Sequence, residues 1–221
     1  MKKMTLTKKI TITAMFIALS YALTFLFHHL RLVPFPSVPF LTYDPKDILI
    51  CIAGFILGPW VALGISVGVS FIEMITISTT YFYGFIMNIV STCAFVIPAS
   101  VVYKSKKSFS GALISLGVGF VCSVAVMALW NIIITPIYMG YPREVIIKSF
   151  LLYIVLFNVL KTGLNVAAVL LFYKPIINAL RATKLIQKGN SKWDLKQTAI
   201  MVGLGLFILI SLIITWILVN Q

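Results

Sequence analysis

The apolar run between Phe150 and Tyr173 most constrains this chain, because it is long enough to cross a bilayer as a helix. Lys161 lies inside the run, and a charge at mid-bilayer is costly unless it faces the protein interior or a wet cavity. Asn158, Lys161 and Asn165 are spaced i, i+3 and i+7, so they share one stripe of the helix. The stripe predicts the wall of a polar pocket. The alternative is a polar patch that joins helices, as Asn often does in membranes.

Most of the remaining chain is equally apolar. Hydrophobic residues make up 61% of it, the mean hydropathy is +1.07, and only five residues are acidic. This composition predicts an all-α integral membrane protein. The net charge of +13 does not indicate nucleic-acid binding, because the cations lie in short segments between apolar runs. The predicted helices cover residues 10–27, 47–57, 60–77, 83–103, 110–134, 143–173 and 198–219.

The distribution of the basic residues predicts the topology, because cytoplasmic loops of membrane proteins are rich in Lys and Arg. If each helix crosses once, the basic segments before the first, after the fourth and after the sixth helix share one side. That side is then cytoplasmic and holds the N-terminus, while the loop 30–45 and the C-terminus are outside. We expect a substrate-binding domain over 1–176, a basic cytoplasmic linker over 177–197 and an additional transmembrane helix over 198–219. The opposite side holds few cations: Arg31, Lys46, Arg143 and Lys148.

The outside loop ends in the sequence LTYDPKDI, which carries two of the five acids, Asp44 and Asp47. Pro45 favours an extended backbone before it, so Leu41 to Asp44 could present unpaired backbone groups to a ligand. We expect Asp47 to cap the N-terminus of the second helix rather than to contact a ligand. For Asp44 both roles remain open.

Other polar residues lie within the predicted spans. Asn88 is an intramembrane amide, and Asn131 lies between Trp130 and Tyr138 in the sequence ALWNIIITPIY. This group could anchor the helix at the membrane interface, or it could bind a flat polar ring by an amide hydrogen bond with aromatic stacking. Glu73 lies near the outer end of its helix, where we expect its side chain to reach water.

Small residues four apart, Ala14, Ala18 and Ala22, form one stripe of the first helix. Such a stripe allows close approach of another helix in lipid, either within the chain or from a partner. The sequence has no G-x-x-x-x-G-K-[ST] phosphate loop and no G-x-S-x-G or H-E-x-x-H motif, so we expect no catalytic residue. The adjacent pair His28-His29 has no third ligand at helical spacing, and the three cysteines form no C-x-x-C, so no metal site is expected. A binding pocket without an energy source suggests that another subunit supplies the energy.

In several segments the chain resembles the substrate-binding S component of an energy-coupling factor (ECF) vitamin transporter, and most of all the riboflavin-specific type. The alanine stripe is generic to S components, whereas the loop acids and the N-x-x-K of the sixth helix are more specific to flavin-binding members. The segments that carry the resemblance are the stripe at 14–22, YDPKDI at 43–48, AGFILGPWVAL at 53–63, IPA at 97–99, WNIIITPIY at 130–138 and FNVLKTGLNVAAVLLFYKPI at 157–176.

The resemblance implies a core of six helices that holds the vitamin near the outer face under the loop after the first helix. A seventh helix has no place in that pattern and is additional. The alanine stripe is then the face that contacts the transmembrane coupling (T) subunit, which two ATPases drive. The implied binding residues are Leu41, Thr42, Tyr43, Asp44, Asn88, Asn131, Asn158 and Lys161, to which the stripe on the sixth helix adds Asn165.

The resulting hypothesis is a substrate-capture subunit of an ATP-driven vitamin importer in a bacterial plasma membrane. Riboflavin is the expected transported ligand, and no cofactor is expected. Another water-soluble vitamin is the nearest alternative. An integral-membrane lipid enzyme is disfavoured, because the predicted spans contain too few acids for a catalytic cluster. A structural membrane protein without a ligand is the remaining alternative.

Overall fold

The computed structural model describes residues 4–183, 185 and 195–219, and these residues form helices with no strand among them. The all-α prediction is therefore confirmed. The helices are α1 (Leu6–Leu30), α2 (Lys46–Leu57), α3 (Pro59–Thr76), α4 (Tyr81–Ser105), α5 (Phe109–Met139), α6 (Arg143–Val145), α7 (Leu151–Ala182) and α8 (Leu195–Val219), with a π-helical turn, Ile146–Phe150, between α6 and α7. In the described part of the chain, six segments are long and apolar enough to cross a membrane: Leu6–Leu30, Pro59–Thr76, Tyr81–Ser105, Phe109–Met139, Arg143–Ala182 and Lys196–Ile214.

The short helix α2 lies inside the bundle and does not span it. Its 12 residues extend for about 18 Å, whereas the hydrocarbon core of a bilayer is about 30 Å thick. The assumption that every helix crosses once is therefore wrong for α2. The helix ends at Gly58, whose φ of 100° disfavours residues with a side chain, and Pro59 starts α3. Ile50, Cys51 and Ile52 are fully buried, and α2 packs against α1, α3, α4 and α7.

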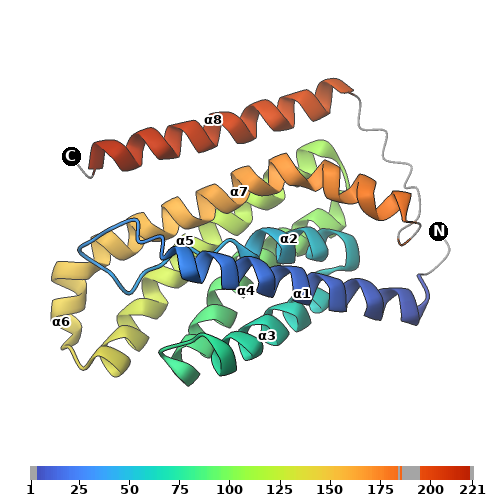
Figure 1. Ribbon diagram of the computed structural model, residues 1–221. Helices are drawn as coiled ribbons and strands as arrows, with labels where there is room; N and C mark the ends of the chain where they lie inside the picture. The colour runs from blue at the N-terminus through green and yellow to red at the C-terminus, as the bar shows by residue number, and fades with distance from the viewer. Residues whose placement is uncertain (1–3, 184, 186–194, 220–221) are drawn as a thin grey trace.

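The long helices run roughly along one axis, with their connections gathered at two ends (Figure 1). The start of α1, the turn between α4 and α5, and the end of α7 lie at one end. The loop after α1 and the short helix α6 lie at the opposite end, where α8 also finishes. The described basic residues at the start of α1, after α4 and at the end of α7 are therefore grouped at the first end, which is the grouping that the charge pattern predicted for them.

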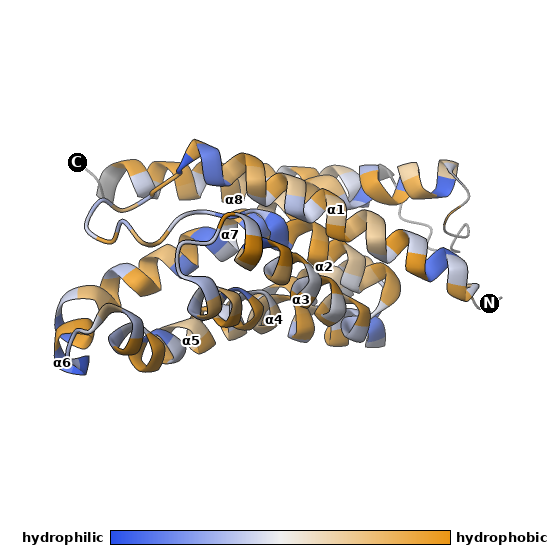
Figure 2. Cartoon of the chain, turned by 60° about the horizontal axis from the view of Figure 1, so that its bottom comes forward, coloured by the Kyte–Doolittle hydropathy of each residue, from blue (hydrophilic) through white to orange (hydrophobic). Residues whose placement is uncertain are grey.

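The outer surfaces of the helices are apolar, as Figure 2 shows by the orange colour along most of them. On α8, for example, Phe207 is 69% exposed and Ile210 is 54% exposed. A soluble domain rarely shows such a large continuous apolar surface, whereas a lipid-facing helix requires one. Hydrophilic residues are found mainly at the ends of helices and inside the bundle near α2 and α7 (Figure 2).

The last two long helices differ from the predicted boundaries. α7 continues to Ala182, so residues 177–182 of the predicted linker are helical, and the π-helical turn interrupts the predicted helix near its start. Three lysines of the predicted linker, Lys184, Lys188 and Lys192, lie outside the described residues. The additional helix is present as α8, which lies alongside α7 (Figure 1).

Candidate functional site

Lys161 is buried inside the bundle, where residues of α2 and α4 contact its ammonium group. It lies on α7 and is 8% exposed. Its Nζ lies 3.5 Å from Oδ2 of Asp47 at the start of α2, and it donates a hydrogen bond of 3.1 Å to Oγ of Ser91 on α4. The charge therefore faces the protein interior, as the cost of a lysine in lipid requires.

Asn165, one turn along α7, joins the same group to the loop after α1. We call residues 31–45 the cover loop, because they close this end of the bundle. Asn165 donates to Asp47 Oδ2 at 3.4 Å, and its Oδ1 accepts a hydrogen bond of 3.1 Å from the hydroxyl of Tyr43 in the cover loop. Thr92 on α4 donates to the other Asp47 oxygen at 2.6 Å. The cover loop, α2, α4 and α7 therefore meet at one carboxylate.

The prediction that Asp47 caps α2 is wrong. The Asp47 carboxylate turns inward, where it accepts hydrogen bonds from Thr92 and Asn165 rather than from backbone N–H groups at the start of α2. Asp44 instead lies beside the helix start, where it accepts hydrogen bonds from the Lys46 backbone N–H at 3.1 Å and from Thr24 on α1 at 3.0 Å. Sequence spacing alone favoured the cap because it does not reveal a partner on a distant helix.

A second ion-pair group lies next to the first. Lys46, 1% exposed, donates to both carboxylate oxygens of Glu73 on α3 at 2.7 and 2.8 Å and also pairs with Asp44. Asn88 on α4 donates to the same Glu73 carboxylate. Glu73 is 3% exposed, so the expectation that it reaches water is wrong. We call the two groups together the polar cluster: Tyr43, Asp44, Lys46, Asp47, Glu73, Asn88, Ser91, Thr92, Lys161 and Asn165.

The charges of the cover-loop end of this cluster stabilise one another. Burial by itself would raise the pKa of Asp44, but the cations of Lys46 and Lys161 outweigh it and hold that pKa below its usual value. Burial would lower the pKa of Lys46, yet the carboxylates of Asp44 and Glu73 raise it above the usual value. Burial also raises the pKa of Tyr43, so its phenol keeps its proton and remains a donor. Near neutral pH these groups are therefore held as ions beside a neutral phenol.

Asn131 and Asn158 are buried but bond to their own helices. Asn131, fully buried, donates to the Met127 carbonyl at 2.8 Å, and Asn158 donates to the Ile154 carbonyl at 2.8 Å. Among the hydrogen bonds of the described residues, none joins either amide to the polar cluster. Asn158 nevertheless lies one turn before Lys161 on α7. Their predicted role as ligand-binding groups stays a prediction.

The cover loop packs onto α7 by aromatic and apolar contacts. Phe35, Val38 and Phe157 form a small buried core, against which Leu41 also packs. The Phe40 ring lies 6.4 Å from Tyr138 of α5 and 6.3 Å from Phe150, measured between ring centroids. Aromatic rings from the end of α5 and from the π-helical turn before α7 therefore contact the loop.

The backbone of the cover loop is less free than predicted. The N–H of Leu41 donates to Val38 O at 3.0 Å, and the N–H of Tyr43 donates to Leu32 O at 2.9 Å. Thr42 lies between them and is exposed. The expectation that the backbone from Leu41 to Asp44 is unpaired is therefore wrong for two of its N–H groups.

The alanine stripe faces outward. Ala14, Ala18 and Ala22 are all exposed, whereas the opposite side of α1 buries Ile12 and Phe16 among other residues. Within the described residues, the stripe therefore packs against no other helix of this chain. No three His, Cys, Asp or Glu side chains of the described ranges come together to hold a metal ion.

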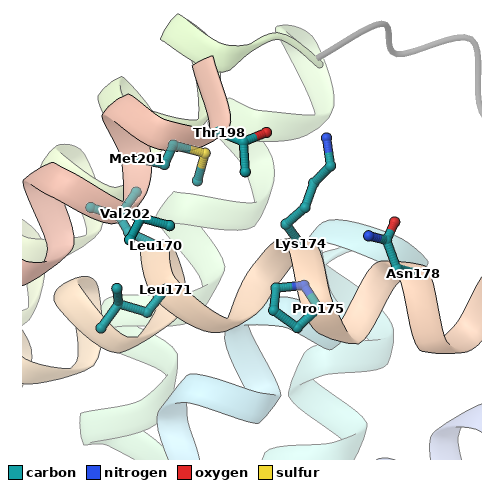
Figure 3. A pocket seen from close by; sticks show the side chains of 8 residues that line it. All are labelled: Leu170, Leu171, Lys174, Pro175, Asn178, Thr198, Met201 and Val202. Atoms are coloured by element: carbon teal, nitrogen blue, oxygen red, sulfur yellow. The ribbon is translucent and has the colours of Figure 1, made fainter. Parts of the chain in front are cut away.

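A cavity of about 190 Å³ lies between α7 and α8, towards the linker end of both helices. None of the predicted site residues lines it. Figure 3 shows its lining, which is apolar on one side and polar around Lys174: Leu170, Leu171, Lys174, Pro175, Asn178, Thr198, Met201 and Val202.

Sequence reasoning missed Lys46, Glu73, Ser91 and Thr92. The signal for Glu73 was available, because a lone acid within an apolar span requires a buried partner as Lys161 does. Lys46 was assigned to the outer side because the predicted topology puts the loop after the first helix there. Ser91 and Thr92 carry no sequence signal, since hydroxyls in membrane helices usually bond back to their own backbone.

Comparison with known proteins agrees with this fold. A solved structure described as "Structure and mechanism of the S component of a bacterial ECF transporter" superposes with a TM-score of 0.69, over 80% of this chain and 99% of that chain, at 23% sequence identity. At that identity the likeness shows the fold alone. No curated protein sequence matches the chain. The family model described as "ECF transporter, substrate-specific component" matches residues 8–220, so the chain belongs to the family of ECF transporter substrate-specific components and is a transport subunit rather than an enzyme.

Proposed function

We propose that this chain captures riboflavin, or a closely related flavin, under the cover loop and delivers it to an ATP-driven coupling module. Family membership implies a small-molecule substrate, a membrane-embedded T subunit and partner ATPases. The riboflavin assignment, the bacterial plasma membrane and the cytoplasmic N-terminus are parts of the proposal. In this orientation the cover loop faces the outside and the lysine-rich end faces the cytoplasm.

The observation that carries the proposal is the buried Lys161 next to Asn165 under the cover loop. A flavin presents ring carbonyls, a ring N–H and a chain of hydroxyl groups, and these need matching donors and acceptors when they leave water. The ammonium of Lys161 and the amide of Asn165 supply both kinds. Tyr43 already links Asn165 to the loop at 3.1 Å, so a ligand at this position would contact the loop as well.

The aromatic residues beside the cluster suit the flat part of such a ligand. The Phe40 ring of the loop lies 6.4 Å from Tyr138 of α5 and 6.3 Å from Phe150, measured between ring centroids. A tricyclic ring can bury its apolar faces among such rings while its edge reaches polar groups. Asn131 lies two turns before Tyr138 on the same helix, and it is the proposed amide partner of the ligand ring.

Binding requires an exchange of partners at Lys161. In this structure its ammonium is paired with Asp47 and hydrogen-bonded to Ser91. A ligand acceptor would replace or share these contacts, since a buried ammonium cannot be left without acceptors. The Asp47 carboxylate would keep its bonds from Thr92 and Asn165 during the exchange.

The proposed docking face for the T subunit is the alanine stripe on α1. All three alanines are exposed, and small side chains let a partner helix approach closely in lipid. The stripe lies on the side of α1 away from the buried Phe16, so docking there does not require the core to repack.

Purification from native membranes tests the proposed ligand. We expect the protein to carry a yellow, fluorescent flavin that mass spectrometry identifies as riboflavin, and the stripped protein to quench riboflavin fluorescence on titration. Recovery of a different vitamin would support the alternative ligand within the same class. Protein that carries no small molecule and binds neither riboflavin nor other vitamins would contradict the proposal.

A further inference from the structure

The C-terminal helix α8 is joined to the cover loop by one specific hydrogen bond. The indole Nε1–H of Trp216 donates to the carbonyl oxygen of Pro34 at 2.7 Å, across 182 positions of sequence. Pro34 lies near the start of the cover loop, four residues before the fully buried Val38. The end of α8 and the loop therefore meet at the side of the molecule where the proposed ligand would enter.

α8 is itself held closely against the wall of the polar cluster. A Cβ atom at Gly163 of α7 would lie 2.8 Å from the Leu212 side chain of α8, so a larger residue there would require that side chain to shift. A Cβ atom at Gly205 of α8 would lie 3.0 Å from the Ala167 carbonyl oxygen. Gly163 and Ala167 alternate along α7 with Lys161 and Asn165. The position of α8 is therefore fixed relative to the cluster.

The two ends of the α7–α8 interface differ. The contact between Gly163 and Leu212 lies four residues before Trp216 on α8. At the linker end a cavity of about 190 Å³ lies between the two helices next to Pro175 (Figure 3). α8 therefore packs closely on α7 near the residue that reaches the loop.

Besides the contacts of Asp44 and Phe40 described above, three contacts hold the cover loop to α7 and α8. Phe35 and Val38 pack on Phe157 of α7, Tyr43 bonds to Asn165, and Pro34 accepts from Trp216. Any route from outside to Lys161 under the loop requires these attachments to open. The first two belong to the proposed ligand site, whereas the third comes from a helix that contributes no polar group to the cluster.

From this arrangement we propose that Trp216 is a positioning residue for the cover loop, and that α8 fastens the loop in its closed position. The fastening sets how often the loop opens, and so the rates at which a ligand enters and leaves. The fastening of the loop by Trp216 follows from the contacts described above, whereas its effect on the ligand rates rests on the proposed function.

Loop opening can be measured without any ligand. A Val38→Cys reporter, in a full-length chain in which Cys51, Cys93 and Cys122 are replaced by Ala, is fully buried when the loop is closed. It should react with a membrane-impermeant maleimide only when the loop opens. Trp216→Phe keeps the aromatic ring but removes the donor, and we expect it to accelerate labelling about threefold to tenfold, the range of one hydrogen bond. An unchanged labelling rate in a protein that melts normally would overturn the proposal.

Matched variants separate the hydrogen bond from general loosening. Trp60→Phe, at a site on α3 that is 81% exposed, should leave labelling unchanged. A Ser37→Cys reporter, exposed in the closed loop, should label at the same rate with or without Trp216. If Trp216→Phe fails to fold, Leu212→Ala weakens the seat of α8 at Gly163 without touching the loop, and it should also accelerate labelling of the Val38→Cys reporter. If Leu212→Ala leaves the labelling rate of the Val38→Cys reporter unchanged, the proposed role of α8 is also refuted.

Stopped-flow fluorescence of riboflavin then tests the ligand rates. We expect Trp216→Phe to accelerate both binding and release, with a smaller change in Kd than in either rate. Faster maleimide labelling with unchanged riboflavin rates would refute the loop as the ligand route. If the unmodified protein does not bind riboflavin, the proposed ligand fails, while the labelling experiment still decides the role of Trp216.

Discussion

Replacing Lys161 by Met should affect stability and ligand binding in ways that can be separated. Methionine has a similar volume, but it leaves the Asp47 carboxylate 2% exposed without a cation. Removing one partner of a buried ion pair costs about 3–5 kcal/mol. The carboxylate of Asp47 retains hydrogen bonds from Thr92 and Asn165 in this variant. The distance of 3.5 Å between Lys161 Nζ and Asp47 Oδ2 is also long for a direct bond. We therefore expect the free energy of unfolding to fall by about 3 kcal/mol, the lower end of this range.

The double variant Lys161→Met/Asp47→Asn separates the two effects. The neutral amide can still accept from Thr92, so most of the lost stability should return. Riboflavin binding should remain about tenfold or more weaker in both variants, because a hydrogen bond to a charged group contributes roughly 1.5–3 kcal/mol. Thermal unfolding in detergent and fluorescence titration measure the two quantities. A stable double variant that binds riboflavin as the unmodified protein does would show that Lys161 only joins helices.

Three further perturbations test other parts of the molecule. Ala14→Trp or Ala18→Trp should leave ligand binding by the isolated subunit intact and abolish uptake in cells, since the bulky ring holds a partner helix away from α1; equal loss of both would indicate packing within the chain. Truncation after residue 184 should leave the equilibrium affinity nearly unchanged with some loss of stability, and a folded truncated protein that binds nothing would place α8 in the site. Lys46→Met should lower the melting temperature far more than Glu73→Gln, because it leaves two buried carboxylates unpaired, and similar melting temperatures would refute the shared ion pair.

Hydropathy and spacing predicted the helices because both depend on local sequence. The Gly58-Pro59 pair predicted where α2 ends, and the apolar run predicted that Lys161 and Asn165 must turn inward. The depth of α2 was not predictable in the same way, because a mostly apolar helix of 12 residues can lie in a core or at a surface.

The partners within the site were harder to predict than its position. Helical periodicity shows that residues share a face, but it does not show which helix packs against that face. The Asp47 assignment failed for this reason, since its partners are 45 residues away on α4 and more than 100 away on α7. The sequence indicates that Glu73 needs a buried partner, but identifying Lys46 as that partner required knowledge that Lys46 starts α2 inside the bundle.

The burial of Lys46 has a consequence for how the chain enters the membrane. α2 begins with a cation and an anion and is too short to be inserted as an independent span. α3 follows after a single glycine and carries the carboxylate that binds Lys46. The two helices are therefore expected to enter the bilayer together as a hairpin, with the ammonium neutralised by Glu73 as it leaves water. Biogenesis would then depend on this pair before any ligand is present, and its loss would reduce the amount of protein in the membrane rather than its affinity.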